Sequence, residues 1–301
     1  MKVLKWLGIL VGACLVLACL GYAGIYVASN RFLHKARSVP TAAVAIPTDS
    51  AAIAHGRHLA EAVNKCTDCH GDDLGGKVFL AAGPFATIVA PNLTRGAGGI
   101  AAHYNDADWE RAVRHGIGGD GRALAIMPAE AFQFLSDADL GAVLAYVRSV
   151  PAVDRTLPAT SFGPIGRMLI ARKKLPMFPV EVVNHARTGY TYPAADTSTE
   201  YGHYLANIGG CTSCHNPAMS GGPNPAGPPN SPPPANLTPG GKPQWTEAEF
   251  LRTLREGKTQ DGRDIDVNFM PWRSSGRMTD AEIHAVYRWL RSLPAKELGQ
   301  R

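Results

Sequence analysis

The sequence has few cysteines and, once its first residues are set aside, no net charge. Only six cysteines occur in 301 residues, and two of them, Cys14 and Cys19, lie in an apolar N-terminal run. Residues 1–37 hold five basic side chains and no acidic one, and beyond residue 37 the two signs are equal in number. The pI of about 8.9 therefore comes from the N-terminus, and the charge pattern excludes the basic footprint of a nucleic-acid-binding protein. No convincing alternation of apolar and polar residues predicts strands.

The other four cysteines form two copies of one short motif. Cys-Thr-Asp-Cys-His at 66–70 returns as Cys-Thr-Ser-Cys-His at 211–215. Two cysteines separated by two residues and followed by histidine form the attachment signature of c-type haem. The thiols bind the haem covalently, and the histidine ligates its iron. The motifs therefore predict two covalent haem c groups, each with its iron, held by Cys66, Cys69, His70, Cys211, Cys214 and His215.

A zinc site built from the two cysteine pairs is the alternative. Zinc ribbons place their pairs about 15–20 residues apart, whereas Cys66 and Cys211 are 145 positions apart. Zinc also does not require a histidine directly after each pair. We therefore favour haem.

The N-terminal apolar run is long enough to cross a bilayer. Residues 6–28 are 23 positions without a charge, and a helix rises about 1.5 Å per residue. A secretory signal has an apolar region of only about 7–15 residues. The run therefore predicts a single uncleaved transmembrane helix. Two alternatives stay open: lipidation at Cys19, and cleavage near Ser29.

Beyond residue 37 the chain repeats itself once. The offset between corresponding residues lies between 146 and 141, which indicates a duplicated domain rather than a short-period repeat. The matching segments include Gly56-Arg57-His58-Leu59-Ala60 and Gly202-His203-Tyr204-Leu205-Ala206, Asn92-Leu93-Thr94 and Asn236-Leu237-Thr238, and Met127-Pro128 and Met270-Pro271. We therefore divide the chain into an N-terminal anchor and flank (1–37), a first domain (38–150), a connector (151–198) and a second domain (199–301).

Helical signals dominate both domains. The capping-box pattern occurs at 136–139, 246–249 and 279–282, and apolar residues at helical spacing follow each. Further helices are expected to lead into the two motifs, at 51–65 and about 199–210. The sequence thus predicts an all-α fold in which each domain packs three or more helices around a planar cofactor.

One segment of the connector has two interpretations. Residues 168–177 combine apolar side chains with the basic run Arg172-Lys173-Lys174, a composition that fits contact with a membrane or a partner protein. We favour the plainer interpretation, in which the segment packs along the seam between the two domains.

A methionine is placed to be the second axial ligand in each domain. Met127 lies 57 residues after His70, and Met270 lies 55 residues after His215. Iron with histidine alone is open to small molecules, whereas iron with histidine and methionine is full and suited to electron transfer. Because both methionines precede proline at matching positions, we predict Met127 and Met270 as iron ligands beside His70 and His215. No catalytic residue is predicted.

The order of these segments resembles class I c-type cytochrome domains. It is similar to the cytochrome subunits of membrane-bound bacterial alcohol, aldehyde and gluconate dehydrogenases, over about residues 50–151 and 199–295. The resemblance implies two tandem domains with haem attached outside the cytoplasmic membrane, so the haem domains should be periplasmic. Those subunits typically carry three haem motifs, whereas this chain has two.

We therefore interpret the chain as a membrane-anchored dihaem cytochrome c. It is expected to relay single electrons from a dehydrogenase or quinol-linked donor to a respiratory acceptor such as a terminal oxidase. Its partners would be redox proteins and the membrane, without nucleic acid. The alternative is a dihaem peroxidase, which needs one iron with an open position.

Overall fold

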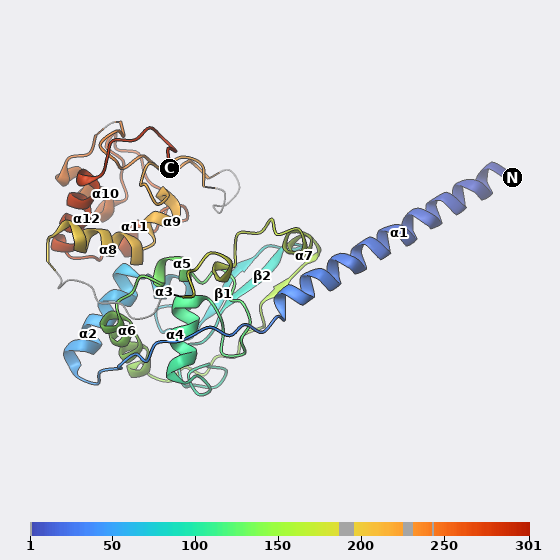
Figure 1. The fold of residues 1–301 in the computed structure, drawn as a ribbon, viewed down its shortest axis with the longest axis horizontal. Helices are drawn as coiled ribbons and strands as arrows, with labels where there is room; N and C mark the ends of the chain where they lie inside the picture. Colours follow the sequence, from blue (N-terminus) through green and yellow to red (C-terminus); the bar gives the residue numbers. More distant parts are fainter. Residues whose placement is uncertain (1, 187–195, 225–230, 243) are drawn as a thin grey trace.

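A long N-terminal helix and two helical units make up the protein. The computed structural model describes residues 2–186, 196–224, 231–242 and 244–301. Figure 1 shows α1 (Lys2–Leu33) projecting alone from the rest of the molecule. It is the one helix among the described residues that is long and apolar enough to cross a membrane. The predicted N-terminal apolar helix is thus confirmed.

The helices of the first unit recur in the same order in the second. The first unit contains α2 (Ser50–His58), the π-helical turn η1 (Leu59–Val63), α3 (Cys66–His70), α4 (Asp106–His115), α5 (Ala129–Phe132) and α6 (Asp137–Ser149). The second contains α8 (Thr199–Ile208), α9 (Cys211–His215), α10 (Glu247–Glu256), α11 (Trp272–Ser275) and α12 (Asp280–Ser292). As predicted, Ser136, Thr246 and Thr279 begin helices, and each side chain accepts a hydrogen bond from the backbone N–H three residues later.

In each unit the helix that leads into the motif crosses the last helix at a glycine. A Cβ on Gly56 in α2 would lie 1.9 Å from the carbonyl oxygen of Ala142 in α6. At the corresponding position, a Cβ on Gly202 in α8 would lie 1.9 Å from the carbonyl oxygen of Ala285 in α12. Only glycine fits there, because the two backbones are in contact.

A single methyl group at this crossing should be strongly destabilising. We expect Gly202→Ala to lower the free energy of unfolding by about 2 kcal/mol or more, because overpacking alone costs about 1–3 kcal/mol and the obstacle here is backbone. Thermal unfolding followed by circular dichroism measures the change. Gly24→Ala is the matched control, since its Cβ meets nothing within 4 Å. Equal unfolding midpoints in the two variants would contradict the close crossing.

The first unit has one residue more than the second ahead of its motif. Five residues separate Ala60 from Cys66, and four separate Ala206 from Cys211. In the first unit the helix widens into the π-helical turn Leu59–Val63, where the second unit has an ordinary α-helix. Because a π turn absorbs one extra residue, both motifs begin at equivalent places.

The two units contact each other through corresponding positions. A residue of the first helix of each unit meets a residue at the start of the last helix of the other unit. His58 Nε2 in α2 lies 2.9 Å from both carboxylate oxygens of Glu282, near the start of α12. Tyr204 in α8 corresponds to His58, and its hydroxyl donates to Asp139, which corresponds to Glu282. One cluster of buried apolar side chains continues from one unit into the other. Figure 1 shows the second unit lying against the side of the first that carries α3 and α5.

Acid should weaken this contact. Burial raises the pKa of Glu282, but hydrogen bonds from His58 and Thr279 outweigh burial and hold that pKa below its ordinary value. Such a carboxylate adds stability above its unfolded pKa of about 4.3 and loses it as the pH falls through the folded pKa. We expect Glu282→Gln to lower the unfolding midpoint at about pH 7, with a difference from the unsubstituted protein that shrinks toward about pH 3. A difference that does not change with pH would contradict this account. Glu297→Gln, at an exposed position near the C-terminus, is the control.

A small antiparallel sheet joins the first unit to the connector, and the sequence did not predict it. Its strands are β1 (Lys77–Ala81), β2 (Ala86–Ala90) and β3 (Ser161–Phe162), in that order across the sheet. β1 is exposed along most of its length and β3 has two residues. Such short runs carry little alternation, which is why the pattern was missed.

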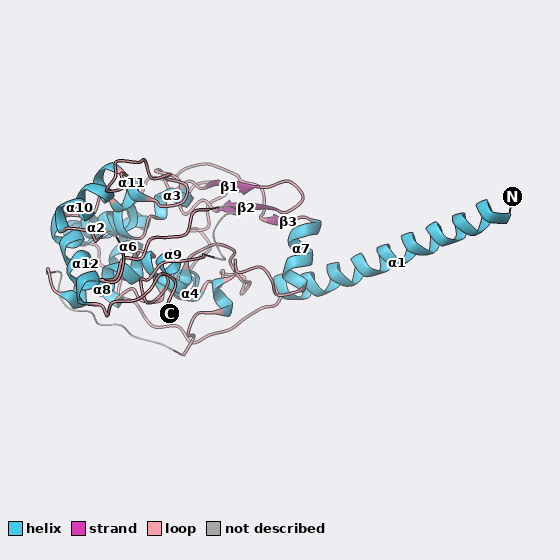
Figure 2. Ribbon diagram, turned by 90° about the horizontal axis from the view of Figure 1, so that it is seen from above, coloured by secondary structure: helices cyan, strands magenta, loops and turns pink. Residues whose placement is uncertain are grey.

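The expected position of the connector was wrong in one respect. Its helix α7 (Pro164–Ala171) does not lie along the seam but packs against α1 and the sheet, ahead of the short η2 (Pro179–Glu181) (Figure 2). Ile170 and Phe162 belong to a second apolar cluster that includes Phe32 at the end of α1. The connector helix therefore packs against the apolar end of α1, and not against the seam between the two domains as we expected. Connector residues 187–195 lie outside the described part of the chain.

Candidate haem sites

The two motif histidines are held in the same way. His70 Nδ1 lies 2.9 Å from the carbonyl oxygen of Pro91, and His215 Nδ1 lies 2.8 Å from that of Ala235. A carbonyl can only accept, so Nδ1 carries the proton and Nε2 is left as the nitrogen that can bind a metal. Burial lowers the pKa of both histidines, which favours the neutral form that coordinates iron.

An Asn-Leu-Thr segment fixes the accepting carbonyl in each unit. Asn92 directly follows Pro91; its Nδ2 donates to the carbonyl of Val153 at 2.7 Å, and its Oδ1 accepts from the backbone N–H of Thr94 at 2.9 Å. In the second unit Asn236 repeats both bonds, to the carbonyl of Lys296 at 2.7 Å and from the N–H of Thr238 at 3.0 Å. The segment thus ties the loop beside the histidine to the chain beyond the last helix. The sequence showed the repetition but not this role.

The four motif cysteines suit covalent attachment rather than free thiol chemistry. All four are unpaired thiols, two in α3 and two in α9. Burial raises the pKa of Cys66 to about 12 and that of Cys69 to about 11, and it also raises the pKa of Cys211 and Cys214. Reactive cysteines have lowered pKa values instead. Across the described residues no three His, Cys, Asp or Glu side chains gather as a metal site.

The two methionines proposed as axial ligands have matching surroundings. Met127 and Met270 are half-buried against the apolar core. Each precedes a proline that begins a short helix, with φ −80° and ψ 58° at Pro128 and φ −77° and ψ 56° at Pro271. Met219, by contrast, is fully buried in the core. Ligation by Met127 and Met270 stays a prediction, now supported by equal local geometry.

The two motifs are tied to each other across the interface. Asn64 Nδ2 donates to the carbonyl of Ile208 at 3.0 Å, and Lys65 Nζ donates to the carbonyl of Gly209 at 2.6 Å. These carbonyls lie at the end of α8, where a helix has unpaired acceptors and favours a cation.

A helix of the second unit also contacts the first motif. Ser274 Oγ in α11, just after Met270, donates to Asp68 Oδ1 within the first motif at 2.6 Å. The short helix that follows each predicted methionine thus lies against the other unit, since α5 likewise contacts α8 and α9.

The backbone at Lys65 indicates that the bond from Lys65 to the second unit has a structural role. Lys65 has φ +56°, a left-handed conformation that is costly for a residue with a side chain. The position before the motif in the second unit is Gly210, with φ +72°, which adopts the same conformation without that cost. The duplicate thus shows that glycine would suffice locally. A lysine at this position is explained by its bond to the other unit.

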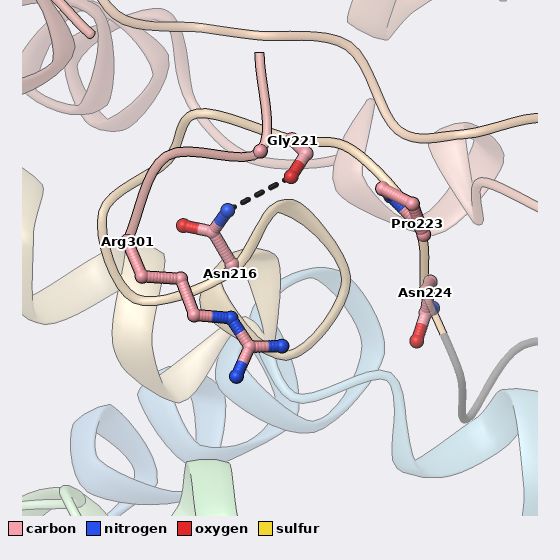
Figure 3. Close-up of a pocket in the computed structure, with 6 residues that line it drawn as sticks. Asn216, Gly221, Pro223, Asn224 and Arg301 are labelled. Carbon is pink, nitrogen blue, oxygen red and sulfur yellow. Dashed lines mark hydrogen bonds between the residues drawn. The ribbon is translucent and has the colours of Figure 1, made fainter. Parts of the chain in front are cut away.

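One pocket near the second motif lies apart from the predicted haem-binding residues. It has a volume of about 330 Å³ and is lined by residues that include Asn216, Gly221 and Arg301 (Figure 3). There Asn216 Nδ2 donates to the carbonyl of Gly221 at 2.8 Å and closes the loop after His215. None of the eight predicted ligands and attachment residues lines this pocket.

A family model corresponds to both units. The model described as cytochrome c matches residues 53–151 and 200–294. The chain belongs to the cytochrome c family. Family membership confirms covalent haem c with iron as the cofactor, and the mostly helical fold with a small sheet agrees with it.

Similar proteins are cytochrome subunits of dehydrogenases. The chain is 27% identical over 291 residues to the fructose dehydrogenase cytochrome subunit of Gluconobacter japonicus, covering 88% of this chain and 57% of that protein. It is 28% identical over 282 residues to the alcohol dehydrogenase (quinone) cytochrome c subunit of Komagataeibacter europaeus, covering 82% and 57%. It is 26% identical over 282 residues to the gluconate 2-dehydrogenase cytochrome c subunit of Pantoea cypripedii, covering 84% and 62%. The chain therefore spans less than two thirds of the length of these relatives.

The comparisons confirm the resemblance inferred from the motifs. The relatives are electron-transfer components of dehydrogenases rather than their catalytic subunits, which agrees with the interpretation of this chain as an electron-transfer protein. The domain boundaries and the individual ligands remain predictions.

Proposed function

We propose that the chain is a membrane-anchored, two-haem electron-transfer subunit that works with a dehydrogenase. The observation that carries this proposal is the pair of matched motifs, each with its histidine Nδ1 bonded to a backbone carbonyl. Bound haem c supplies a one-electron couple at each site. The cysteines would attach it, and His70, His215, Met127 and Met270 would hold its iron.

The contacts between the motifs favour electron exchange within one chain. Lys65 and Asn64 reach the end of α8, and Ser274 reaches Asp68. These bonds hold the two attachment segments at one separation, so an electron that enters at one site can pass to the other without diffusion of a second protein.

The junction of α1 with the connector supports an uncleaved anchor. Ser29 is buried, and its hydroxyl accepts a hydrogen bond from Arg167 at 3.2 Å. The Arg167 guanidinium also lies 4.3 Å from the centre of the Tyr26 ring. Cleavage near Ser29 would remove the Tyr26 ring from Arg167 and disrupt its bond to Ser29, leaving the carbonyl of Phe162 as its partner. We therefore propose a single pass through the cytoplasmic membrane with the haem units in the periplasm.

The proposed redox partner follows from the similar proteins. They belong to dehydrogenases of fructose, alcohols and gluconate, so we propose a dehydrogenase as donor and a quinone-linked complex or terminal oxidase as acceptor. The second candidate, a peroxidase, requires an open iron. The equal backbone geometry after Met127 and Met270 supports two like sites rather than one closed and one open.

Difference spectra of membranes test this function. Membranes that contain the chain would receive fructose, ethanol or gluconate, and reduction of its haems would be followed at the α-band. We expect at least one substrate to reduce the haems, and membranes without the chain to lack that signal. Haems that no dehydrogenase substrate reduces, together with rapid consumption of hydrogen peroxide by the purified chain, would favour the peroxidase instead.

A further inference from the structure

Helix α7 lies across the end of α1. Figure 2 shows α7 beside the last turns of α1, at the edge of the protein from which α1 departs. Arg167 in α7 contacts the Tyr26 ring and donates to Ser29, and Phe32 packs in the apolar cluster that contains Ile170. These contacts fix α7 to the last turns of α1.

The two faces of α7 differ in a way that the fold does not explain. Its inner face buries Gly166 and Ile170. Residues spaced three and four apart form the outer face: Ile165, Met168, Leu169 and Arg172. Ile165 is 45% exposed, Met168 and Leu169 are half-buried, and Arg172 is exposed.

A basic turn continues this outer face. Lys173 and Lys174 follow Arg172 and are exposed as well. Residues 163–178 contain four basic side chains and no acidic one. An apolar face that ends in clustered lysine and arginine is typical of helices that lie in a membrane interface.

The length of α1 determines where α7 lies relative to the bilayer. A hydrocarbon core about 30 Å thick takes about 20 helical residues, so a span that begins near Trp6 ends close to Tyr26. Tyrosine prefers the boundary between lipid and water. Because α7 contacts Tyr26 and Ser29, it lies at the level of the headgroups. This step rests on the proposed span of α1.

We propose that α7 and the basic turn 172–174 form a second contact with the membrane. The outer apolar face sits at the boundary of headgroups and acyl chains, and the basic turn binds anionic phospholipid headgroups. The exposed Arg31 and Lys35 at the end of α1 add positive charge. One spanning helix alone lets the haem units rotate about its axis. A second contact away from that axis fixes which face of those units meets a partner in the membrane.

Hydrogen exchange on the full haem-loaded chain tests the contact. The chain would be placed in nanodiscs of phosphatidylcholine alone, in nanodiscs that also contain phosphatidylglycerol, and in detergent. We expect amides of 164–174 to exchange at least fivefold more slowly in the phosphatidylglycerol nanodiscs than in detergent. The triple variant Arg172→Glu, Lys173→Glu, Lys174→Glu should lose that protection. The matched control Lys242→Glu, Arg252→Glu, Arg277→Glu, at exposed positions of the second unit, should keep it.

The outcomes separate this contact from the anchor. A chain that co-purifies with nanodiscs but shows the same exchange of 164–174 in nanodiscs and detergent overturns the second contact and leaves the anchor intact. A chain that fails to enter nanodiscs overturns the anchor and the contact together. Protection of 164–174 that arises only after a solubilised membrane protein is added also overturns the lipid contact and assigns the face to that protein.

Discussion

In a protein with Met127→Leu, carbon monoxide should bind the reduced haem of the first unit, and with Met270→Leu it should bind that of the second. Leucine keeps the volume of methionine but has no sulfur to donate, so each substitution opens one iron. The unsubstituted protein should not bind carbon monoxide, because an iron with histidine and methionine has no open position. Absorbance of the reduced protein with and without the gas measures the response. The change in each single variant should be about half that of the double variant, since each opens one of two sites.

Met219→Leu is the control for this series. Met219 is fully buried in the core of the second unit, so its replacement changes the packing without changing a ligand. We expect no response to carbon monoxide. A response in the unsubstituted protein would mean that one iron is naturally open, and the peroxidase interpretation would then replace the electron carrier. A Met127→Leu variant without any response would remove Met127 from the ligand set.

Replacement of one cysteine pair should halve the haem content of the chain. With Cys211→Ala and Cys214→Ala the second unit loses both covalent links, and the haem of that unit is lost during purification. The second unit should also lose order, because the predicted haem would pack against its apolar residues. The first unit should keep its haem, since its motif is complete. Haem per chain, measured as the pyridine haemochrome under denaturing conditions, should fall from two to one.

Two further variants complete this test. Replacement of Cys66 and Cys69 by alanine should leave the other single haem, and the two variants should differ in their reduced spectra. Replacement of Cys14 and Cys19 by serine is the control, since both lie in α1 and are exposed there; two haems should remain. A haem content that stays at two when a motif pair is removed would contradict covalent attachment by that motif.

The features of this fold that could be predicted from the sequence are those that depend on residues close together in the chain. The capping residues Ser136, Thr246 and Thr279 act within their own helices, so their spacing was sufficient to place the helix starts. The haem motifs are equally local, because attachment needs residues within one turn of helix. Because the domain is duplicated, each of these local patterns occurs twice in the sequence, and each copy supports the interpretation of the other.

Contacts between distant segments were not visible in the same way. The bond of His58 to Glu282 joins residues 224 positions apart, and nothing in either neighbourhood indicates the other. Asn92 was recognised as a repeated residue, but its partner Val153 lies beyond the last helix. The Nε1–H of Trp272 donates to the carbonyl of Ile265 at 3.0 Å, and no pattern in the sequence indicates that partner. Such partners depend on tertiary packing, which periodicity does not encode.

Lys65 is the exception, because the duplication itself carried a signal. Where one copy has glycine before the motif, the other has lysine, and only the glycine suits the left-handed backbone. A mismatch of this kind between two copies marks a residue whose role lies outside its own unit. For Lys65 that role is the hydrogen bond from its Nζ to the carbonyl of Gly209 in the second unit.

The exchanged contacts between the units have a consequence for assembly. Because position 58 meets 282 and its counterpart 204 meets 139, the interface is isologous, like that of a two-fold symmetric dimer whose subunits have been fused. An isologous interface is closed: each half occupies the other's patch, and no copy of the patch remains free to add a third unit. We therefore expect any further cytochrome domain or redox partner to dock on the outer faces of the pair rather than at this interface.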